Sequence, residues 1–487
     1  MTTELAEAAE TEAERKRREA SARKVKHLTQ TERAAKGKAA RGKVPRRMLG
    51  EWAPSPKRVD AVDILERQAG TRVPELVPIR YGRMLVSPFT FYRGAAAIMA
   101  ADLAEGPQSG LHAQLCGDAH LSNFGAFAAP DRRMLFSVND FDETLPGPFE
   151  QDVKRLVASF AVAGRDRGFD PKVRAGINAI VGRSYRESMR RFASMHNMEL
   201  WYARIDVEDV VRDFAKRAGA KQRKRLAKNV AHARTKDSLK AFGKLTEVVD
   251  GERRIVSDPP LIVPVEELVE PGEEQSVREA FREMIRVYAR TLPEERRRLL
   301  ERFRYVHAAR KVVGVGSVGT RAWIVLLLGQ DNDDPLFLQA KEAQASVLEP
   351  HLGKSQFASH GQRVVEGQRL MQSASDILLG WFNTEGLDGV KRDFYVRQLW
   401  DAKGSALLDV IEPSAFEFYA RLCGWTLAKA HARSGDPLAI ASYLGTSSVF
   451  EQALAAFGET YADQNERDYQ ALKDAVDSGR VTAEAGL

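Results

Sequence analysis

Hydrophobic positions along the chain change their spacing near residue 301. Between Phe149 and Gly164, apolar residues recur three or four positions apart, which predicts an amphipathic helix opened by Pro148. Helical patterns continue to about residue 240. After residue 301, apolar residues gather in short runs rich in β-branched and aromatic side chains, which predict strands over 305–313, 321–328, 336–341 and 394–399. The second pattern predicts a small unit built around a sheet.

Shorter patterns complete the prediction on both sides of this change. Before it, we expect helices over 61–68 and 94–103, strands over 111–116, 124–127 and 134–138, and a hairpin over 245–256. After it, we expect helices over 361–375, 415–432 and 450–475. The patterns divide the chain into a tail (1–48), a mainly helical half (59–300), a β-rich half (301–405) and C-terminal helices (406–487). The predicted fold class is α+β.

Composition excludes several classes of protein. The chain has 487 residues, of which 44% are hydrophobic and 29% charged, as is typical of globular proteins. Its two cysteines, Cys116 and Cys423, argue against a disulfide scaffold and are typical of a reducing compartment. No apolar run approaches the about 18 residues of a membrane span, and the charged start lacks the apolar core of a secretory signal. We therefore expect a cytoplasmic protein with no membrane partner.

The positive charge of the chain is concentrated at its start. Residues 1–50 hold 14 Lys/Arg and 7 Asp/Glu, and their net charge equals the +7 of the whole chain. Because this stretch has few large apolar residues, 1–48 is predicted to be a basic tail that is disordered or loosely helical. Such a tail can contact nucleic acid weakly, although a solubilising extension is the simpler interpretation.

The most informative motif is Cys116-Gly117-Asp118-Ala119-His120-Leu121-Ser122-Asn123. Phosphoryl transfer to a hydroxyl needs a carboxylate that orients the nucleophile and receives its proton, and a nearby amide oxygen can bind Mg²⁺. The five-residue spacing of Asp118 and Asn123 lets one loop present both groups to one cleft. The alternative is a Gly-Asp turn without a catalytic role.

A second acidic motif, Asn139-Asp140-Phe141-Asp142, follows the two strands predicted over 124–127 and 134–138. Asp140 is predicted to be the main Mg²⁺ ligand, with Asp142 as a second carboxylate. Mg²⁺ prefers oxygen ligands and usually shares them with substrate phosphates. The presence of both motifs at this separation favours catalysis over simple turns.

A glycine-rich loop, with candidate ATP-binding residues Gly314, Gly316, Ser317 and Gly319, lies far downstream. Dinucleotide-binding folds share this pattern, but there the glycines open a helix. Here a strand is predicted after Gly319, and strand, glycine loop, strand is the arrangement in which backbone N–H groups cover the phosphates of ATP. A strand at this position would exclude a dinucleotide-binding oxidoreductase.

Lys341 ends the next predicted strand, where it would bind the α- and β-phosphates of ATP. The alternative is a solvated strand end. An acidic residue should hold this lysine, and both Glu349 and Glu366 are candidates. Glu342 would point to the opposite face of the strand.

The segments 117–123 and 139–142 resemble the catalytic and metal loops of aminoglycoside and choline kinase-like phosphotransferases. Those loops usually begin with His-Gly-Asp, whereas Cys116 replaces the histidine here. Residues 148–152 resemble the segment after the metal loop, in which an Asp braces the catalytic loop. The resemblance implies that role for Asp152, and it implies ATP and Mg²⁺ as cofactors.

The chain from about Val59 to Tyr469 is similar to the bacterial domain of unknown function 2252 family, whose name implies no reaction. The similarity lies in residues 87–94, 117–125, 139–143, 368–372 and 428–433. Residues 425–431 also resemble the helix that precedes the catalytic loop in kinase-like enzymes, yet here they follow the glycine loop. The resemblance therefore implies a protein-kinase-like, two-lobed fold that is circularly permuted, with an added helical region. Permutation costs little where the original termini lie close together.

We therefore expect an ATP- and Mg²⁺-dependent phosphotransferase acting on a hydroxyl of an unidentified acceptor, with a small molecule favoured. The helical region 165–300 is expected to shape the acceptor pocket. Two alternatives remain: nucleotidyl (AMP) transfer on the same scaffold, and a non-catalytic protein that binds ATP or associates with nucleic acid through its tail.

Overall fold

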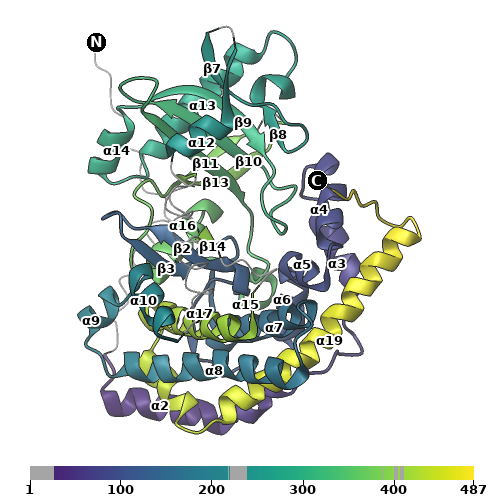
Figure 1. Cartoon of the computed structure of the whole chain (residues 1–487), viewed down its shortest axis with the longest axis vertical. Helices are drawn as coiled ribbons and strands as arrows, with labels where there is room; N and C mark the ends of the chain where they lie inside the picture. The colour runs from purple at the N-terminus through teal and green to yellow at the C-terminus, as the bar shows by residue number, and fades with distance from the viewer. Residues whose placement is uncertain are drawn as a thin grey trace.

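A sheet-based part and a helical part lie one above the other (Figure 1). The computed structural model describes residues 27–217, 219, 238–249, 251–386, 388–399, 404–405 and 411–486. The chain is a mixed α and β protein with several sheets, as predicted. In the part of the chain that the structure describes, no helix is both long and apolar enough to cross a membrane.

The sheet-based part is built on one antiparallel sheet of six strands. Their order is β12 (Gly380–Glu385), β13 (Lys391–Gln398), β11 (Pro335–Ala343), β10 (Ala322–Leu328), β9 (Arg304–Lys311) and β8 (Ile262–Pro264). The four strands predicted after residue 301 are confirmed as β9, β10, β11 and β13. The sequence prediction missed β8 and β12. The hairpin predicted over 245–256 is confirmed as β6 (Thr246–Val249) and β7 (Glu252–Ile255).

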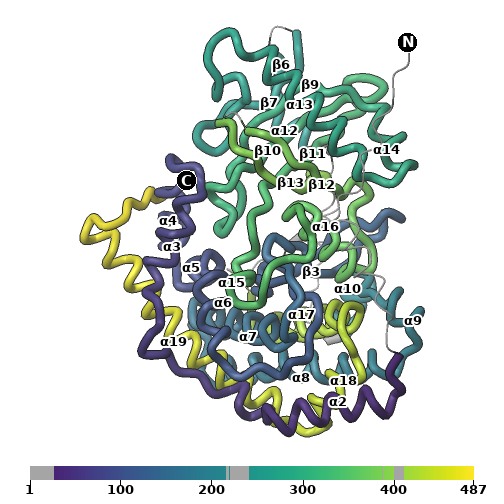
Figure 2. Tube along the Cα trace, turned by 180° about the vertical axis from the view of Figure 1, so that it is seen from behind, coloured from purple at the N-terminus to yellow at the C-terminus, as the bar shows by residue number. Residues whose placement is uncertain are grey.

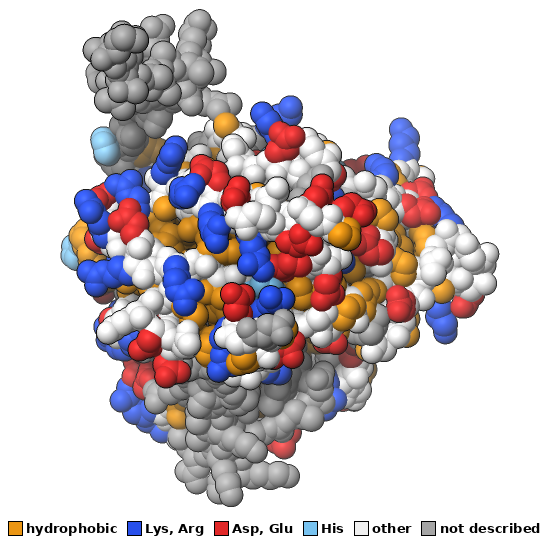
Figure 3. All heavy atoms as spheres, turned by 90° about the horizontal axis from the view of Figure 1, so that it is seen from above, with side chains coloured by type: hydrophobic (Ala, Val, Ile, Leu, Met, Phe, Trp, Pro, Cys, Tyr) orange, Lys and Arg blue, Asp and Glu red, His pale blue; other side chains and the backbone are white. Residues whose placement is uncertain are grey.

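Both faces of this sheet are covered, which explains its continuous apolar strands. Successive side chains of β10 point to opposite faces. Val325 and Leu327 pack with α13 (Glu274–Ala289) on one face. Ile324 and Leu326 pack on the other face with α12 (Ser238–Leu245). Seen from above, Lys/Arg and Asp/Glu side chains are interspersed over this part of the surface (Figure 3).

The helical part surrounds α7 (Phe149–Asp166), whose first 16 residues are all buried. Around it pack α8 (Pro171–Ala193), α17 (Pro413–Ser434) and α19 (Val449–Asp477). The remaining helices of this part are short: α3 (Ala61–Ala69), α4 (Val77–Met84), α5 (Pro88–Gly94), α6 (Ala96–Ala104), α9 (Asn197–Tyr202), α10 (Val207–Arg217) and α18 (Pro437–Leu444). The helices predicted over 61–68, 415–432 and 450–475 are confirmed as α3, α17 and α19.

Two small sheets accompany these helices. One joins β1 (His112–Leu115) to β4 (Leu145–Pro148). The other has the order β14 (Gly404–Ser405), β2 (Phe124–Ala128), β3 (Met134–Val138) and β5 (Ile205–Asp206). The three strands predicted before residue 150 are confirmed as β1, β2 and β3.

The end of α17 meets the start of β1, although more than 300 residues separate them in the sequence. The Gln114 backbone N–H donates to Ser434 Oγ at 3.0 Å. A side chain at Gly435 would press on the His112 carbonyl oxygen, 2.8 Å from a Cβ atom. The helix and the strand are therefore close enough for a short direct connection.

The prediction of a disordered or loosely helical tail is wrong about disorder in the second half of the tail, where a helix docks on the fold. Helix α2 (Gln30–Lys43) begins with a capping box formed by Thr29 and Glu32, and it packs along α18 (Figure 2). Gly37 and Ala40 are buried in that contact. Small residues allow two helix backbones to approach closely, so a composition poor in large apolar residues is compatible with a docked helix here. Residues 1–26 lie outside the described part of the chain.

We expect Gly37→Ala to lower the free energy of unfolding by about 1–3 kcal/mol, because its Cβ would collide with the Ala439 carbonyl of α18. Gly42→Ala is the matched control on the same helix, since nothing lies within 4 Å of its added Cβ. That change should be neutral or stabilise by up to about 1 kcal/mol. Chemical denaturation of both variants tests the docking of α2, and equal effects would contradict it.

Candidate active site

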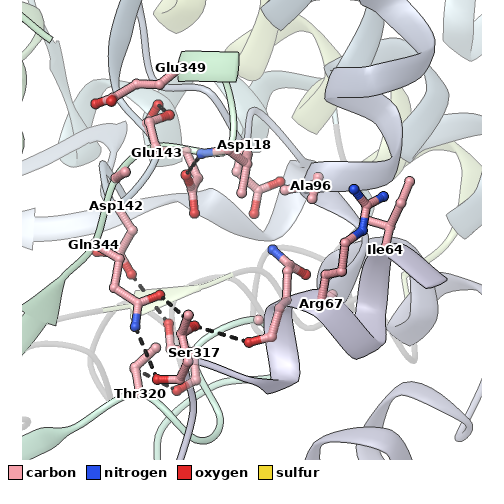
Figure 4. A pocket seen from close by; sticks show the side chains of 18 of the residues that line it. Ile64, Arg67, Ala96, Asp118, Asp142, Glu143, Ser317, Thr320, Gln344 and Glu349 are labelled. Atoms are coloured by element: carbon pink, nitrogen blue, oxygen red, sulfur yellow. Dashed lines mark hydrogen bonds between the residues drawn. The ribbon is translucent and has the colours of Figure 1, made fainter. Parts of the chain in front are cut away.

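A cavity of about 710 Å³ lies between the sheet-based and helical parts. Its walls come from helices α3 and α6, the Asp118 loop, the segment 140–143, the glycine loop and residues 342–354 (Figure 4). The expectation that residues 165–300 shape the pocket is wrong for this cavity, because none of its lining residues belongs to that range. Residues 59–101 form this wall instead.

The Asp118 loop is held from below by the first turns of α7. Asp152 accepts hydrogen bonds from the backbone N–H groups of Cys116 at 2.8 Å and Gly117 at 3.1 Å. Gly117 has φ +83°, and a side chain there would collide with the Glu143 carbonyl. His431 Nε2 of α17 lies 3.1 Å from the Asp152 carboxylate. The structure thus places Asp152 where the resemblance implied it.

Arg155, one turn after Asp152 on α7, holds the Asp118 side chain. Its Nε and Nη2 each lie 2.7 Å from Asp118 Oδ1, while Oδ2 lies 3.7 Å from His120 Nε2, and Asp118 lines the cavity. Burial raises the pKa of Asp118, and the Arg155 guanidinium opposes that shift. The sequence prediction missed Arg155, although its three-residue spacing from Asp152 places both on one face of a helix.

The β2–β3 hairpin brings the two acidic motifs together. Phe124 pairs with Val138, and the Asn139 N–H donates to the Asn123 carbonyl at 3.0 Å. The Asn123 side chain donates to the Asp118 carbonyl at 2.9 Å. The hydrogen bond between Asn139 and Asn123 thus brings Asn123 next to the segment that carries Asp140. Asp118 and Asp140 line the same cavity.

Asp142 receives side chains from the sheet-based part. Lys341 Nζ donates to Oδ2 at 2.5 Å, and the Tyr395 hydroxyl donates to Oδ1 at 2.6 Å. Ser317 Oγ of the glycine loop is 3.3 Å from Oδ2. Burial alone raises the pKa of Asp142, but these partners, Lys341 above all, lower it below its ordinary value. Burial and the Asp142 carboxylate raise the pKa of neighbouring Asp140.

Lys341 is thus paired with Asp142, and neither predicted partner contacts it. Glu349, in α15 (Glu349–Leu352), lines the cavity and lies 3.7 Å from His360 Nδ1. Glu366, in α16 (His360–Met371), pairs with Arg369 one turn later. The predictions for Glu349 and Glu366 as lysine partners are therefore wrong, because the strand register directs Lys341 toward the acidic segment.

Helix α16 contributes an arginine that the sequence prediction missed. Arg363 donates to the Thr144 carbonyl at 2.7 Å, to the Asp142 carbonyl at 2.8 Å and to the Gln344 carbonyl at 2.9 Å. It ties the acidic segment to the end of β11. No local pattern distinguishes Arg363 from a surface arginine on a helix.

Asp140 and Asn123 are the residues that fit a magnesium ion best. Asp142 is already engaged by three donors, so its predicted role as a metal ligand does not match its contacts. Among the described residues, no group of three His, Cys, Asp or Glu side chains forms a metal site. Mg²⁺ commonly uses one or two protein carboxylates together with substrate phosphates and water, and Asp140 supplies one carboxylate at the cavity.

The glycine loop lies between two strands, β9 and β10, as predicted. Gly316 and Ser317 line the cavity. Gly314 and Gly319 have φ +63° and +87°, and they anchor the loop on the helical part. Arg83 donates to the Gly314 carbonyl at 2.7 Å, and the Val73 N–H donates to the Gly319 carbonyl at 2.8 Å. Because a strand follows Gly319, the dinucleotide fingerprint is excluded.

The burial of Glu143 leads us to expect that the free energy of unfolding depends on pH. Glu143 accepts from the Val347 N–H at 2.7 Å, and burial raises its pKa to about 7. Glu143 therefore binds its proton more tightly in the folded protein than in the unfolded one. The protonated carboxyl stabilises the fold below pH 4.5, and this stabilisation is lost as the pH rises to about 7. Relative to the Glu143→Gln variant, the free energy of unfolding of the wild type should fall by about 1–3 kcal/mol over this pH range. Urea denaturation at several pH values measures this loss.

The exposed Glu301 supplies the control for this experiment, since Glu301→Gln removes a carboxyl from the surface and leaves the buried Glu143 in place. A constant difference between the wild type and Glu143→Gln across the pH range would contradict the prediction.

Comparison with curated proteins and with solved structures gives no match. One family matches the chain, over residues 72–475, and its description is "Uncharacterized protein conserved in bacteria (DUF2252)". Most of the helical part, the whole six-stranded sheet and the acidic segment lie within that match, whereas the cavity wall formed by α3 precedes it. The protein therefore belongs to the DUF2252 family.

Proposed function

We propose that this protein is an ATP- and Mg²⁺-dependent phosphotransferase with a permuted, kinase-like arrangement of two lobes. The observation that carries the proposal is the meeting of Lys341 and Asp142 at 2.5 Å, in the cavity that also contains Asp118, Asp140 and the glycine loop. In kinases, a strand lysine and a glycine-rich loop hold the phosphates, opposite a metal-binding Asp and a catalytic Asp. Here Asp118, Asp140 and the glycine loop line the cavity, and Lys341 lies behind Asp142, which also lines it.

The reaction follows from the position of Asp118. The acceptor oxygen forms a bond to the γ-phosphorus of ATP while the bond from that phosphorus to the β–γ bridging oxygen breaks. ADP leaves with the electron pair. Asp118 Oδ2 orients the hydroxyl and accepts its proton, while Arg155 keeps Oδ1 fixed. Asp140 and Asn123 would hold Mg²⁺, which supplies charge neutralisation at the phosphates.

The swapped order of the two halves is supported by the contact between α17 and β1. In the proposed ancestor, the helix ending near Ser434 continues into the catalytic loop through a strand such as β1. Gln114 and Ser434 lie within hydrogen-bonding distance, so one short connection would restore that order. The site itself is formed by tertiary contacts that do not depend on the order of the segments.

We expect Asp118→Asn to lower kcat by about 10²–10⁴-fold while ATP binding persists, because only the proton acceptor is removed. Transfer from γ-labelled ATP into a pool of hydroxyl compounds measures the change. Asp131→Asn on the β2–β3 turn, paired only with exposed or half-buried arginines, is the control. Undiminished transfer by Asp118→Asn would refute the assignment. A product heavier by AMP would establish nucleotidyl transfer instead.

We expect Lys341→Met to weaken ATP binding by about tenfold or more, because a charge-assisted contact to the phosphates is lost. Titration with a fluorescent ATP analogue in the presence of Mg²⁺ measures the affinity. Tyr395→Phe removes another Asp142 partner but no positive charge, so its effect should be smaller. Equal affinities in the wild type and Lys341→Met would remove the lysine from the nucleotide site.

A further inference from the structure

The cavity has two chemically different sides. Asp118, Asp140, Asp142 and Glu143 line one side of it. On the other side, helices α3 and α4 and the residues between them contribute Arg67, Arg72 and Arg80, which we call the arginine wall. Figure 4 shows Arg67 across the open space from Asp142 and Glu143, with Asp118 between them in this view.

Arg80 is a buried cation without a counter-charge. Its side chain is 1% exposed, and Nη2 donates to Gln68 Oε1 at 3.0 Å and to the Gly94 carbonyl at 3.1 Å. Nε and Nη1 are buried with no hydrogen-bond partner, and no carboxylate pairs with Arg80 in the described part of the chain. A buried guanidinium that lacks an anion is costly, and such groups are normally paired.

The neighbours of Arg80 increase this cost. Arg72 donates to the Val318 carbonyl of the glycine loop, and its positive charge adds to burial in lowering the pKa of Arg80. Arg67, on the exposed rim, donates to the carbonyl of Asp63 at 3.3 Å and forms no ion pair with a described residue. Three arginines therefore line one wall, and the deepest of them has two buried nitrogens, Nε and Nη1, without a hydrogen-bond partner.

The phosphates of ATP do not account for this wall under the proposed function. Lys341 and Ser317, which would contact those phosphates, lie at Asp142 on the acidic side. Arg72 contacts the glycine loop through the Val318 carbonyl, whereas the hydrogen bonds of Arg67 and Arg80 go to Asp63, Gln68 and Gly94 within the helical part. Arg67 and Arg80 line the same cavity as Asp118 without contacting the loop that would hold the phosphates of ATP.

We propose that the acceptor carries an anionic group, a phosphate or a carboxylate, in addition to the hydroxyl that receives the phosphoryl group. The arginine wall binds the anionic group while Asp118 orients the hydroxyl. Guanidinium groups suit this task because they bind planar carboxylates and phosphates through paired N–H donors. This inference rests on the proposed function, and it narrows the acceptor to bifunctional hydroxyl compounds.

Anion binding without ATP tests the wall directly. Calorimetric titration with inorganic phosphate and with acetate should show binding to the wild type by at least one of them, and their comparison separates phosphate from carboxylate recognition. Arg80→Met and Arg67→Ala should each weaken binding at least about tenfold. Arg298→Ala, on the exposed face of α14 (Glu294–Leu300), is the matched control and should bind as the wild type does. If Arg80→Met does not fold, Arg67→Ala at the rim decides the result.

Matched acceptors then test the consequence for turnover. Glycerol 3-phosphate and glycerate should give a higher kcat/KM than glycerol, and Arg67→Ala should reduce this preference about tenfold. Equal use of glycerol and its anionic relatives by the wild type would overturn the inference and leave the phosphotransferase proposal intact. If the protein binds anions but turns over no ATP under any condition, the phosphotransferase proposal is refuted and the anion site stands. A parallel loss of ATP affinity in Arg67→Ala would assign the wall to ATP and overturn the inference.

Discussion

The ion pair between Lys341 and Asp142 joins the two parts of this protein at the cavity. The lysine comes from the central strands of the six-stranded sheet, and the aspartate follows the β2–β3 hairpin of the helical part. Lys341 also pairs in register with Tyr395 of β13, whose hydroxyl reaches the other oxygen of the same carboxylate. A buried ion pair contributes little net stability after desolvation, so its main effect is positional. It fixes where the glycine loop lies relative to Asp118.

The Asp118 loop is fixed by a second network on its opposite side. Asp152 and Arg155 reach it from α7, and His431 joins from α17. The Tyr185 hydroxyl of α8 lies 2.8 Å from His431 Nδ1, which extends the network to a third helix. Removing one member of such a buried network leaves its partners unsatisfied, at a cost of a few kcal/mol. The loop can therefore be short and glycine-containing and still hold a fixed position.

The parts of this architecture that sequence could predict are those encoded by local periodicity and spacing. The strands around the glycine loop follow from apolar runs, and the Asp118, Asn123 and Asp140 set follows from spacing around one hairpin. The partner of Lys341 could not be predicted, because it depends on how two distant segments pack. Glu349 and Glu366 are nearer in sequence, yet Asp142 is nearer in space. Helix α2 was missed for a related reason, since the fit of Gly37 against α18 is a tertiary property.

The helices that carry Arg67 and Arg80 are held in place by residues from the far end of the chain. Residues near the C-terminus lie against α3 and α4 in both ribbon and tube views (Figures 1 and 2). The Glu484 N–H donates to the Pro78 carbonyl of α4 at 2.9 Å, and Arg480 pairs with Asp63 and Glu66 of α3. These contacts hold the helices that carry Arg67 and Arg80. A fold that holds an uncompensated arginine against the cavity forgoes stability there, as binding sites commonly do in exchange for preorganisation.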